Sequence, residues 1–575
     1  MSADTSGRGS PRGAAVALRD SFEAWHLAFR GSAHRMARFF ETGDWQAIAG
    51  ESADRLRLYG QHVVRALVEV ETHAGPRADH AFWIAMRDVY AGLVAGRDDE
   101  EIAETFFSSV TRVAFDTVGV DAAIEFHRPW SDDEPRDGVE ACCRVLRLGD
   151  AMSLDDAVVA LLTAVPHRFA DRDADAVLLA EALRARIAQA WGAAVPQQIE
   201  ILESVFYRAR GAYLVGRITA GERMLPLLVA LRGSPEGAVV DALLTDEDDL
   251  SIVFGFAWSY FHVDVAKPGA VVAFLRELMP LKRVDELYTA LGYHKHGKTE
   301  LYRELTHHLA TPGAEFAVAE GTPGLVMSVI TLPSFSIVLK IIRDRIGAPK
   351  RTTRTEVMGQ YRRVFLRDRV GRLADAQLFQ GLAFPRECFP DPLLRELLHD
   401  APSVVRADGD RVAIGQLYTQ RRLRPLNLYL QEAAPADADA AILDYGRAIK
   451  ELAAANIFTG DLLLKNFGVS RHGRVIFYDY DELAAVTDCT FRRMPVAATD
   501  EDELSAEPWY HVHDDDVFPE ELLAFMVPRG HFRDVFLSEH ADLLDADWWI
   551  ALQERLRAGE QPEVLPYGAD RRLRP

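Results

Sequence analysis

The chain has 575 residues, 49% of them hydrophobic and 26% charged, so it is long enough for two or more domains with sizeable cores. A formal net charge of −22 argues against a general binder of nucleic acid or of anionic membranes. The four cysteines contain no CxxC pair, no apolar run reaches the length of a membrane span, and the polar N-terminus lacks the apolar region of a signal peptide. We therefore expect a cytoplasmic protein without a disulfide framework or a zinc site.

The first half of the chain is predicted to be mostly helical. Residues 1–14 are rich in Gly, Ser, Arg and Pro and are expected to form a flexible tail. From residue 15 to about 310, apolar residues recur mostly at helical spacing. Between 199 and 261 this pattern loosens, and the apolar content of 206–218 and 224–232 permits a small sheet.

A Pro/Gly break at 309–314 predicts a domain boundary. Beyond it, 315–319, 325–332 and 336–342 are predicted strands. The turn between the first two contains two glycines, which allow backbone N–H groups to approach phosphates. That turn alone is weak evidence, because a two-glycine hairpin is usually only a hairpin.

Lys340 is a stronger signal, since it lies inside the apolar strand 336–342. An unpaired buried ammonium is costly, so this lysine should have an acidic or phosphate partner. Its position sixteen residues after Gly324 leaves room for a strand, a turn and half a strand. A lysine placed in this way can neutralise phosphate oxygens.

Residues 355–379 are predicted to be helical. Glu356 could pair with Lys340, as a glutamate does in protein kinases, or it could be an ordinary first-turn glutamate favoured by the helix dipole. The charged segment that follows contains Arg369 and Arg372, which either form structural salt bridges or face phosphate.

The next elements are a strand at 412–418, a connector at 419–425 and a helix starting at 426–430. A strand, a short connector and a helix in this order are typical of the hinge between the two lobes of a kinase. A second helix is predicted at 442–455.

Three oxygen-bearing side chains then follow at fixed spacing. Asp461 precedes Asn466 by five residues, and Asp479 follows thirteen residues later. Asp461 can accept a proton from a hydroxyl, while Asn466 and Asp479 can hold Mg²⁺ on ATP phosphates, and protein kinases divide the work in this order. The surrounding letters differ from the usual ones, since Gly precedes Asp461 and Tyr-Asp follows Asp479.

The segment between these residues is predicted to form a hairpin, with strands at 467–470 and 475–480 and a turn at 471–473. A hairpin brings its two ends together, and with them Asn466 and Asp479. The alternative is a surface hairpin whose carboxylates are only solvated. The C-terminal RRLRP sequence is predicted to be loose.

Several stretches resemble one family in the same order along the chain. They are 39–45, 295–303, 326–327, 331–334, 340–344, 368–375, 421–422, 425–429, 453–473, 477–482, 508–510 and 517–520. On these residues the chain resembles the bacterial isocitrate dehydrogenase kinase/phosphatase family over nearly its whole length.

This resemblance implies an α+β fold with a mostly helical N-terminal regulatory domain (15–310) and a C-terminal bilobal protein-kinase-like domain (311–575), with lobes at about 311–418 and 425–575. It implies an enzyme that phosphorylates and dephosphorylates a serine of NADP-dependent isocitrate dehydrogenase. The two activities control flux between the citric acid cycle and the glyoxylate bypass. The resemblance also implies that one ATP/Mg²⁺ site serves both activities, with ATP hydrolysis, ADP as a ligand and AMP as an effector. A homodimer is one option for its assembly.

Carried over residue by residue, the resemblance assigns the ATP lysine to Lys340, the catalytic aspartate to Asp461, the metal ligands to Asn466 and Asp479, and the phosphatase-associated aspartate to Asp375. The nucleotide loop falls on Ala319, Glu320, Gly321, Thr322, Pro323, Gly324 and Leu325. Glu320 stands where the family usually has proline, and a carboxylate there would repel phosphates unless it points outward.

Two other function classes stay open at this point. A kinase-like small-molecule phosphotransferase would share the C-terminal motifs without needing the long helical half. An ATP-binding pseudokinase scaffold would lack one of the residues Lys340, Asp461 or Asp479, all of which are present.

Overall fold

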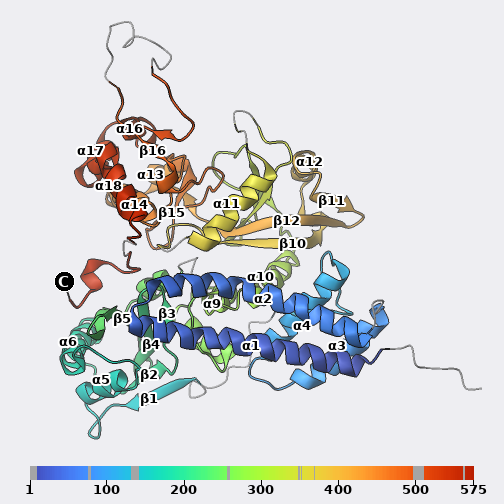
Figure 1. The fold of residues 1–575 in the computed structure, drawn as a ribbon, viewed down its shortest axis with the longest axis horizontal. Coiled ribbons are helices and arrows are strands. Elements are labelled where there is room, and N and C mark those ends of the chain that lie inside the picture. Colours follow the sequence, from blue (N-terminus) through green and yellow to red (C-terminus); the bar gives the residue numbers. More distant parts are fainter. Residues whose placement is uncertain are drawn as a thin grey trace, which may run out of the picture.

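The computed structural model describes residues 9–74, 79–130, 142–255, 260–347, 350, 352–367, 370–495, 510–560 and 564–574. In Figure 1 the N-terminal half, blue to green, lies below the C-terminal half, yellow to red, and both halves contain helices and strands. The expected α+β fold class is confirmed. None of the helices within these ranges is both long and apolar enough to span a membrane.

Long helices form the first part of the chain. They are α1 (Pro11–Thr42), α2 (Trp45–Ala74), α3 (His80–Val94) and α4 (Glu100–Phe115). The first helix begins at Pro11 because the Ser10 hydroxyl accepts a hydrogen bond from the Gly13 amide at 3.1 Å, and proline suits the first helical position. Residues 11–14, predicted to be part of a flexible tail, are therefore helical, whereas 1–8 lie outside the described ranges.

A six-stranded antiparallel sheet in this half is larger than the small sheet predicted. Neighbouring residues of its strand β5 enter different cores: Leu227 and Val229 face one cluster, and Leu228 and Ala230 face another. Because both faces are buried, the strands lack the polar–apolar alternation that marks a half-exposed strand. The strands are β1 (Cys143–Arg147), β2 (Gln198–Leu202), β3 (Phe206–Arg208), β4 (Gly211–Ala220), β5 (Arg223–Ser234) and β6 (Gly237–Leu244), in the order β1-β2-β4-β5-β6 with β3 on β4.

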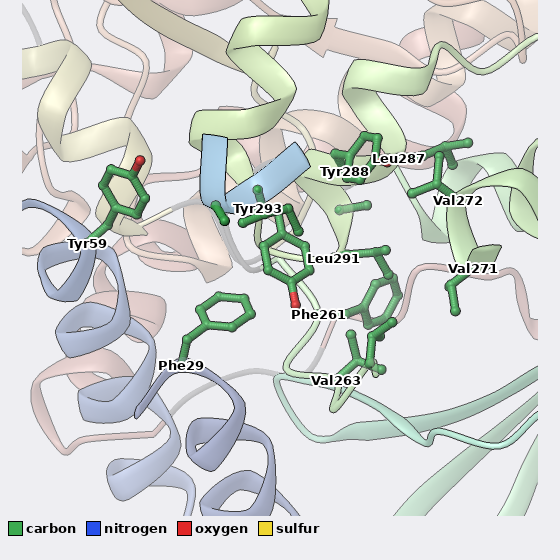
Figure 2. Close-up of a cluster of buried hydrophobic side chains, with 14 of the residues drawn as sticks. Phe29, Tyr59, Phe261, Val263, Val271, Val272, Leu287, Tyr288, Leu291 and Tyr293 are labelled. Atoms are coloured by element: carbon green, nitrogen blue, oxygen red, sulfur yellow. The ribbon is translucent and has the colours of Figure 1, made fainter. Parts of the chain in front are cut away.

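Most of the remaining helices of this half pack on the two faces of the sheet, whereas the apolar residues of α10 pack against the sheet that follows it. These remaining helices are α5 (Leu154–Thr163), α6 (Arg172–Trp191), α7 (Glu247–Val253), α8 (Pro268–Leu278), α9 (Val284–Ala290) and α10 (His294–Leu309). Figure 2 shows part of one core, in which the ring of Phe29 from α1 lies 4.8 Å from that of Tyr293. This core joins the long helices to the sheet and to α9.

The small lobe, defined here as the next sheet with its two helices, follows α10. Its strands are β7 (Ala317–Val318), β8 (Met327–Thr331), β9 (Ile337–Ile342), β10 (Ala376–Pro385), β11 (Val405–Asp408) and β12 (Arg411–Arg421), in the order β10-β12-β9-β8-β7 with β11 on β12. Its helices are α11 (Arg354–Arg367) and α12 (Asp391–Asp400). The strands predicted around the glycine turn and at Lys340 are confirmed.

The helix predicted over 355–379 is wrong in its second half. α11 ends at Arg367, and residues from Ala376 onward belong to β10, which pairs with β12. Gly371 adopts a φ of 63°, a left-handed conformation that interrupts a helix and that glycine adopts without strain. Residues 376–379 form a strand instead of a helix because they pair with β12, which is distant in the sequence.

The large lobe, defined here as the remaining elements, contains the predicted hinge helix and hairpin. Its elements are β13 (Arg424–Pro425), α13 (Leu426–Glu432), α14 (Pro435–Ala454), β14 (Phe467–Val469), β15 (Val475–Phe477), β16 (Thr490–Phe491), β17 (Asp516–Val517), α16 (Pro519–Met526), α17 (His531–His540) and α18 (Ala546–Arg557). Short 3-10 turns cover Leu464–Asn466, Val486–Asp488, Ala541–Leu544 and Ala569–Arg571, and another, Arg386–Cys388, joins β10 to α12 in the small lobe. The second hairpin strand ends at Phe477, three residues earlier than predicted.

The C-terminal residues, predicted to be loose, return to the N-terminal half (Figure 1). The Leu573 amide donates to the Asp241 carbonyl oxygen at 2.7 Å, and the Arg572 guanidinium donates to the Asp241 carboxylate at 3.0 Å. Arg574 pairs with Asp175, a carboxylate with no exposed surface. The buried carboxylates that bind these arginines are distant in the sequence. For this reason the prediction of a loose C-terminal segment was wrong for the described residues up to 574.

Deleting 571–575 is expected to destabilise the fold, because Asp175 would remain buried without Arg574 and Asp241 would keep only the longer pair with Arg232 at 3.7 Å. Removing one partner of such a pair is costly, and with the arginines partly exposed we expect a loss of about 2 kcal/mol in the free energy of unfolding. Thermal unfolding measures this. Arg555→Ala, which breaks only the exposed pair with Glu560, is the matched control and should change stability little. Equal melting temperatures for the deletion and the parent would contradict the prediction.

Candidate active site

Lys340 lies on β9 in the middle of the small-lobe sheet, opposite Val329 of β8 and Tyr418 of β12. Its side chain crosses to the large lobe, where Nζ donates to the Tyr478 carbonyl oxygen at 2.6 Å. Tyr478 directly precedes Asp479 in the chain. The structure therefore brings the predicted phosphate lysine to the predicted metal aspartate.

Burial lowers the pKa of Lys340 to about 8, although the nearby carboxylates of Asp479 and Asp481 act in the opposite direction. The rings of Tyr478 and Tyr480 lie 5.1 and 6.0 Å from Nζ, so the cation also faces aromatic surface. The expectation that Lys340 needs an acidic partner is met by these two aspartates.

Of the two alternatives for Glu356, the structure supports the ordinary first-turn glutamate and not the pairing with Lys340. Glu356 is exposed, its carboxylate accepts a hydrogen bond from the Thr353 amide at 2.7 Å, and its own amide donates to the Thr353 hydroxyl at 3.3 Å. This reciprocal pair caps the N-terminus of α11, as a first-turn glutamate commonly does. Toward the site, α11 presents Tyr361, whose ring stacks on that of Tyr418 at 4.1 Å.

Arg372 forms structural salt bridges rather than facing phosphate. Its guanidinium is 2% exposed and donates to Asp444 at 2.6 Å and to Glu451 at 2.6 Å, both on α14. It thereby ties the start of β10 to the large lobe. Arg369 lies outside the described residues.

Asp461 lies on the loop that follows α14. Its carboxylate accepts the Leu463 amide at 3.0 Å, and its carbonyl oxygen accepts from the Asn466 side-chain amide at 3.3 Å. Gly460 before it has a φ of 71°, and a Cβ there would lie 2.5 Å from the Glu482 carbonyl oxygen. Only glycine fits this close approach, which explains the Gly-Asp sequence at this point.

The hairpin β14–β15 places Asn466 beside the residue before Asp479. Phe467 pairs with Phe477, and the Tyr478 amide donates to the Asn466 carbonyl oxygen at 3.1 Å. Asn466 is 4% exposed. The two predicted metal ligands thus lie at the open end of one hairpin, so the alternative of a merely solvated surface hairpin does not hold.

Two carboxylates meet at this open end. Burial, with the hydrogen bond to Asp481 as the next cause, raises the pKa of Asp479 to about 7, which favours the protonated form. For Asp481, burial is outweighed by that hydrogen bond and by Lys350, so its pKa is lowered. Lys350 lies 3.2 Å from the Asp481 carboxylate. Sequence reasoning missed Lys350, because no local pattern connects it with a residue more than a hundred positions away.

We expect Mg²⁺-dependent nucleotide binding to strengthen as pH rises through about 7 and to level off above that. Metal binding requires the carboxylate form of Asp479, and its raised pKa leaves a smaller fraction of that form at lower pH. Titration of ATP with Mg²⁺ at pH 6, 7 and 8 measures the effect, with metal-free ATP binding as the control. An apparent Mg²⁺ affinity that does not change between pH 6 and 7 would contradict it.

The predicted nucleotide loop, 319–325, is an exposed turn between β7 and β8. Gly321 has a φ of 114°, and a Cβ there would lie 3.4 Å from Pro425 of the hinge, so the loop reaches over the start of the large lobe. Glu320 points outward and pairs with Arg424, which also holds Glu432. Its carboxylate is thus neutralised outside the loop, which removes the expected conflict with phosphates.

Asp375 directly precedes β10 and borders the hairpin. The amide of its neighbour Ala374 donates to the Phe477 carbonyl oxygen at 2.9 Å, and the Tyr480 hydroxyl donates to the Ala374 carbonyl oxygen. Asp375 therefore lies at the same end of the hairpin as Asp479. From the N-terminal half, Lys298 contributes a charge near it.

Two family models together match nearly the whole chain. A family model described as the isocitrate dehydrogenase kinase/phosphatase (AceK) kinase domain matches residues 314–569, and one described as the regulatory domain matches 15–313. The chain is 47% identical to an isocitrate dehydrogenase kinase/phosphatase of Anaeromyxobacter sp. (strain Fw109-5), with 97% of each chain covered. It is 44% identical to that of Xanthomonas euvesicatoria, with 97% of each chain covered, and 39% identical to that of Burkholderia thailandensis, with 96% and 93% covered.

Proposed function

The chain belongs to the isocitrate dehydrogenase kinase/phosphatase family, and from this premise we propose that it phosphorylates a serine of NADP-dependent isocitrate dehydrogenase with ATP and removes that phosphate again. In a cytoplasmic setting, these opposed activities would direct carbon between the citric acid cycle and the glyoxylate bypass. AMP is the proposed effector of the balance between them.

One observation carries the proposal: Lys340 of the small lobe bonds to the backbone of Tyr478, directly beside Asp479 of the large lobe. Groups that can bind phosphate, metal and a hydroxyl proton thus converge where the two lobes meet. Positioning and electrostatics of this kind account for most of the catalysis of phosphoryl transfer.

The residues present fit Mg²⁺. The site offers hard oxygen donors, and the paired carboxylates of Asp479 and Asp481 carry a mutual repulsion that a divalent cation would relieve. Asp479 and Asn466 would hold the ion, which would neutralise charge on the phosphate oxygens.

The chain's own groups supply the remaining functions. Lys340 and the backbone amides of 319–325 would hold the phosphates. Asp461, fixed by its bond from the Leu463 amide, would orient the substrate serine and accept its proton. Asp375 would serve dephosphorylation, either by directing water at the phosphoserine or by routing the phosphate to ADP.

Incubation with isocitrate dehydrogenase, ATP and Mg²⁺, followed by AMP, tests the proposal. We expect phosphoserine to appear as dehydrogenase activity falls, and both to reverse after AMP is added. A parallel screen of hydroxyl-bearing metabolites tests the small-molecule phosphotransferase. Phosphorylation of a metabolite without phosphorylation of the dehydrogenase would overturn the proposal.

Asp375→Ala is expected to lose mainly dephosphorylation, because the residue lies beside the metal end of the hairpin and not on the loop of Asp461. We expect phosphatase turnover to fall by at least about 10²-fold, with a much smaller change in kinase turnover. Release of phosphate from phosphorylated isocitrate dehydrogenase measures the first, and incorporation measures the second. Normal phosphatase turnover would remove Asp375 from the mechanism.

A further inference from the structure

The turn of the catalytic hairpin is attached to helix α7 of the N-terminal half. The Arg471 guanidinium donates to the Ser251 hydroxyl at 3.0 Å, and the His472 ring lies within hydrogen-bond distance of that hydroxyl, at 3.1 Å, and of the Asp248 carboxylate, at 2.9 Å. The opposite end of this hairpin carries Asn466 and Asp479. A hairpin held at its turn has fewer ways to move its open end.

The small lobe is attached to the same half of the chain through its last strand. The Arg421 guanidinium binds both carboxylate oxygens of Glu286, at 3.0 and 3.1 Å. Arg421 ends β12 opposite Ile337 of β9, in the same ladder that places Tyr418 opposite Lys340. The strand that carries Lys340 is therefore bonded to a neighbour fixed by α9.

These two attachments share one support. The Nζ of Lys282, just before α9, donates to the Ser251 carbonyl oxygen of α7 at 3.0 Å, and Lys282 is 5% exposed. Glu286 stays charged, because its burial is outweighed by Arg421, Lys282 and Arg283, which lower its pKa. The α7–α9 support, meaning Asp248, Ser251, Lys282 and Glu286, thus touches both lobes. Its bonds to Arg421 and through the Ser251 hydroxyl are part-buried, whereas the bond between His472 and Asp248 is exposed.

We propose that Glu286, together with Asp248 and Ser251, acts as a set of positioning residues that fixes the separation between Lys340 and Asp479. The inference rests on the proposed nucleotide site and deepens it. Lys340 would hold the phosphates and Asp479 the metal on those phosphates, so their separation decides how much the metal adds to nucleotide affinity. A support that reaches both groups only through Arg421 and the hairpin acts without touching substrate.

Two variants loosen the support at its two ends: Glu286→Gln, and Asp248→Asn combined with Ser251→Ala. ATP dissociation constants are measured with and without Mg²⁺, and thermal unfolding verifies folding. We expect each variant to reduce the Mg²⁺-dependent gain in ATP affinity by about fivefold, with metal-free binding nearly unchanged. Asp155→Asn, which breaks an exposed pair with Arg184 elsewhere in the N-terminal half, is the control and should keep the full gain.

A swapped pair, Glu286→Arg with Arg421→Glu, should recover part of the gain if the attachment itself matters. Parent-like Mg²⁺ dependence in both loosened variants would overturn the inference and leave the proposed function intact. If the parent protein shows no Mg²⁺-dependent gain at all, the proposed nucleotide site fails, and the inference fails with it.

Discussion

Asp461→Ala is expected to abolish both phosphorylation and dephosphorylation of isocitrate dehydrogenase. The substitution removes the proposed proton acceptor and the carboxylate that accepts the Leu463 amide. A positioned general base contributes about 10²–10⁴-fold to rate, so we expect turnover in both directions to fall by at least about 10²-fold. Incorporation and release of phosphate on the same dehydrogenase preparation measure the two directions.

Asp461→Asn separates proton transfer from loop structure, because asparagine keeps an oxygen for the Leu463 amide but is not a base. It should be nearly as inactive as Asp461→Ala while binding Mg²⁺–ATP like the parent protein. Substantial activity in the asparagine variant would show that the carboxylate serves the loop and not the chemistry.

Asp479→Asn is expected to remove the Mg²⁺-dependent part of ATP binding and, with it, both activities. The carboxylate is the charged member of the two proposed metal ligands. With asparagine in its place, both proposed ligands, residues 466 and 479, would be neutral amides. Calorimetric titration of ATP with and without Mg²⁺ measures the loss. Parent-like Mg²⁺ dependence in the variant would contradict the assignment of Asp479 as a metal ligand.

The same variant has an expected effect on stability that separates a metal ligand from a structural residue. Burial raises the folded-state pKa of Asp479 to about 7, above its unfolded value. Its favourable contribution is therefore full below the unfolded pKa and is lost as pH rises through about 7. At pH 8 without metal, Asp479→Asn should unfold at a temperature equal to or above that of the parent. A marked loss of stability there would indicate a structural role.

The sequence predicted the hairpin that carries Asn466 and Asp479 well because its signals are local. Asp461, Asn466 and Asp479 lie within twenty residues, and a short turn between two apolar strands allows only a hairpin that brings its ends together. Lys340 was recognisable for a similar reason, since a charge inside an apolar strand implies a nearby partner. The resemblance to a known family added the order of the elements over the whole chain.

Other features depended on residues far apart in the chain. The sequence left open whether Glu356 pairs with Lys340 or caps its own helix, and the structure shows the cap. Lys350 reaches Asp481 without any local signal. The N-terminal sheet was underestimated because both of its faces are buried.

The sequence by itself determined which side chains are proposed for the chemistry and in what order they occur along the chain. The tertiary structure alone decided which cation faces which carboxylate, where the C-terminal residues dock, and how Glu286 and Ser251 of the N-terminal half reach the two lobes. The physical reason is that spacing along a strand or turn is fixed by covalent geometry, whereas pairing between distant segments depends on the burial and charge balance of the whole fold.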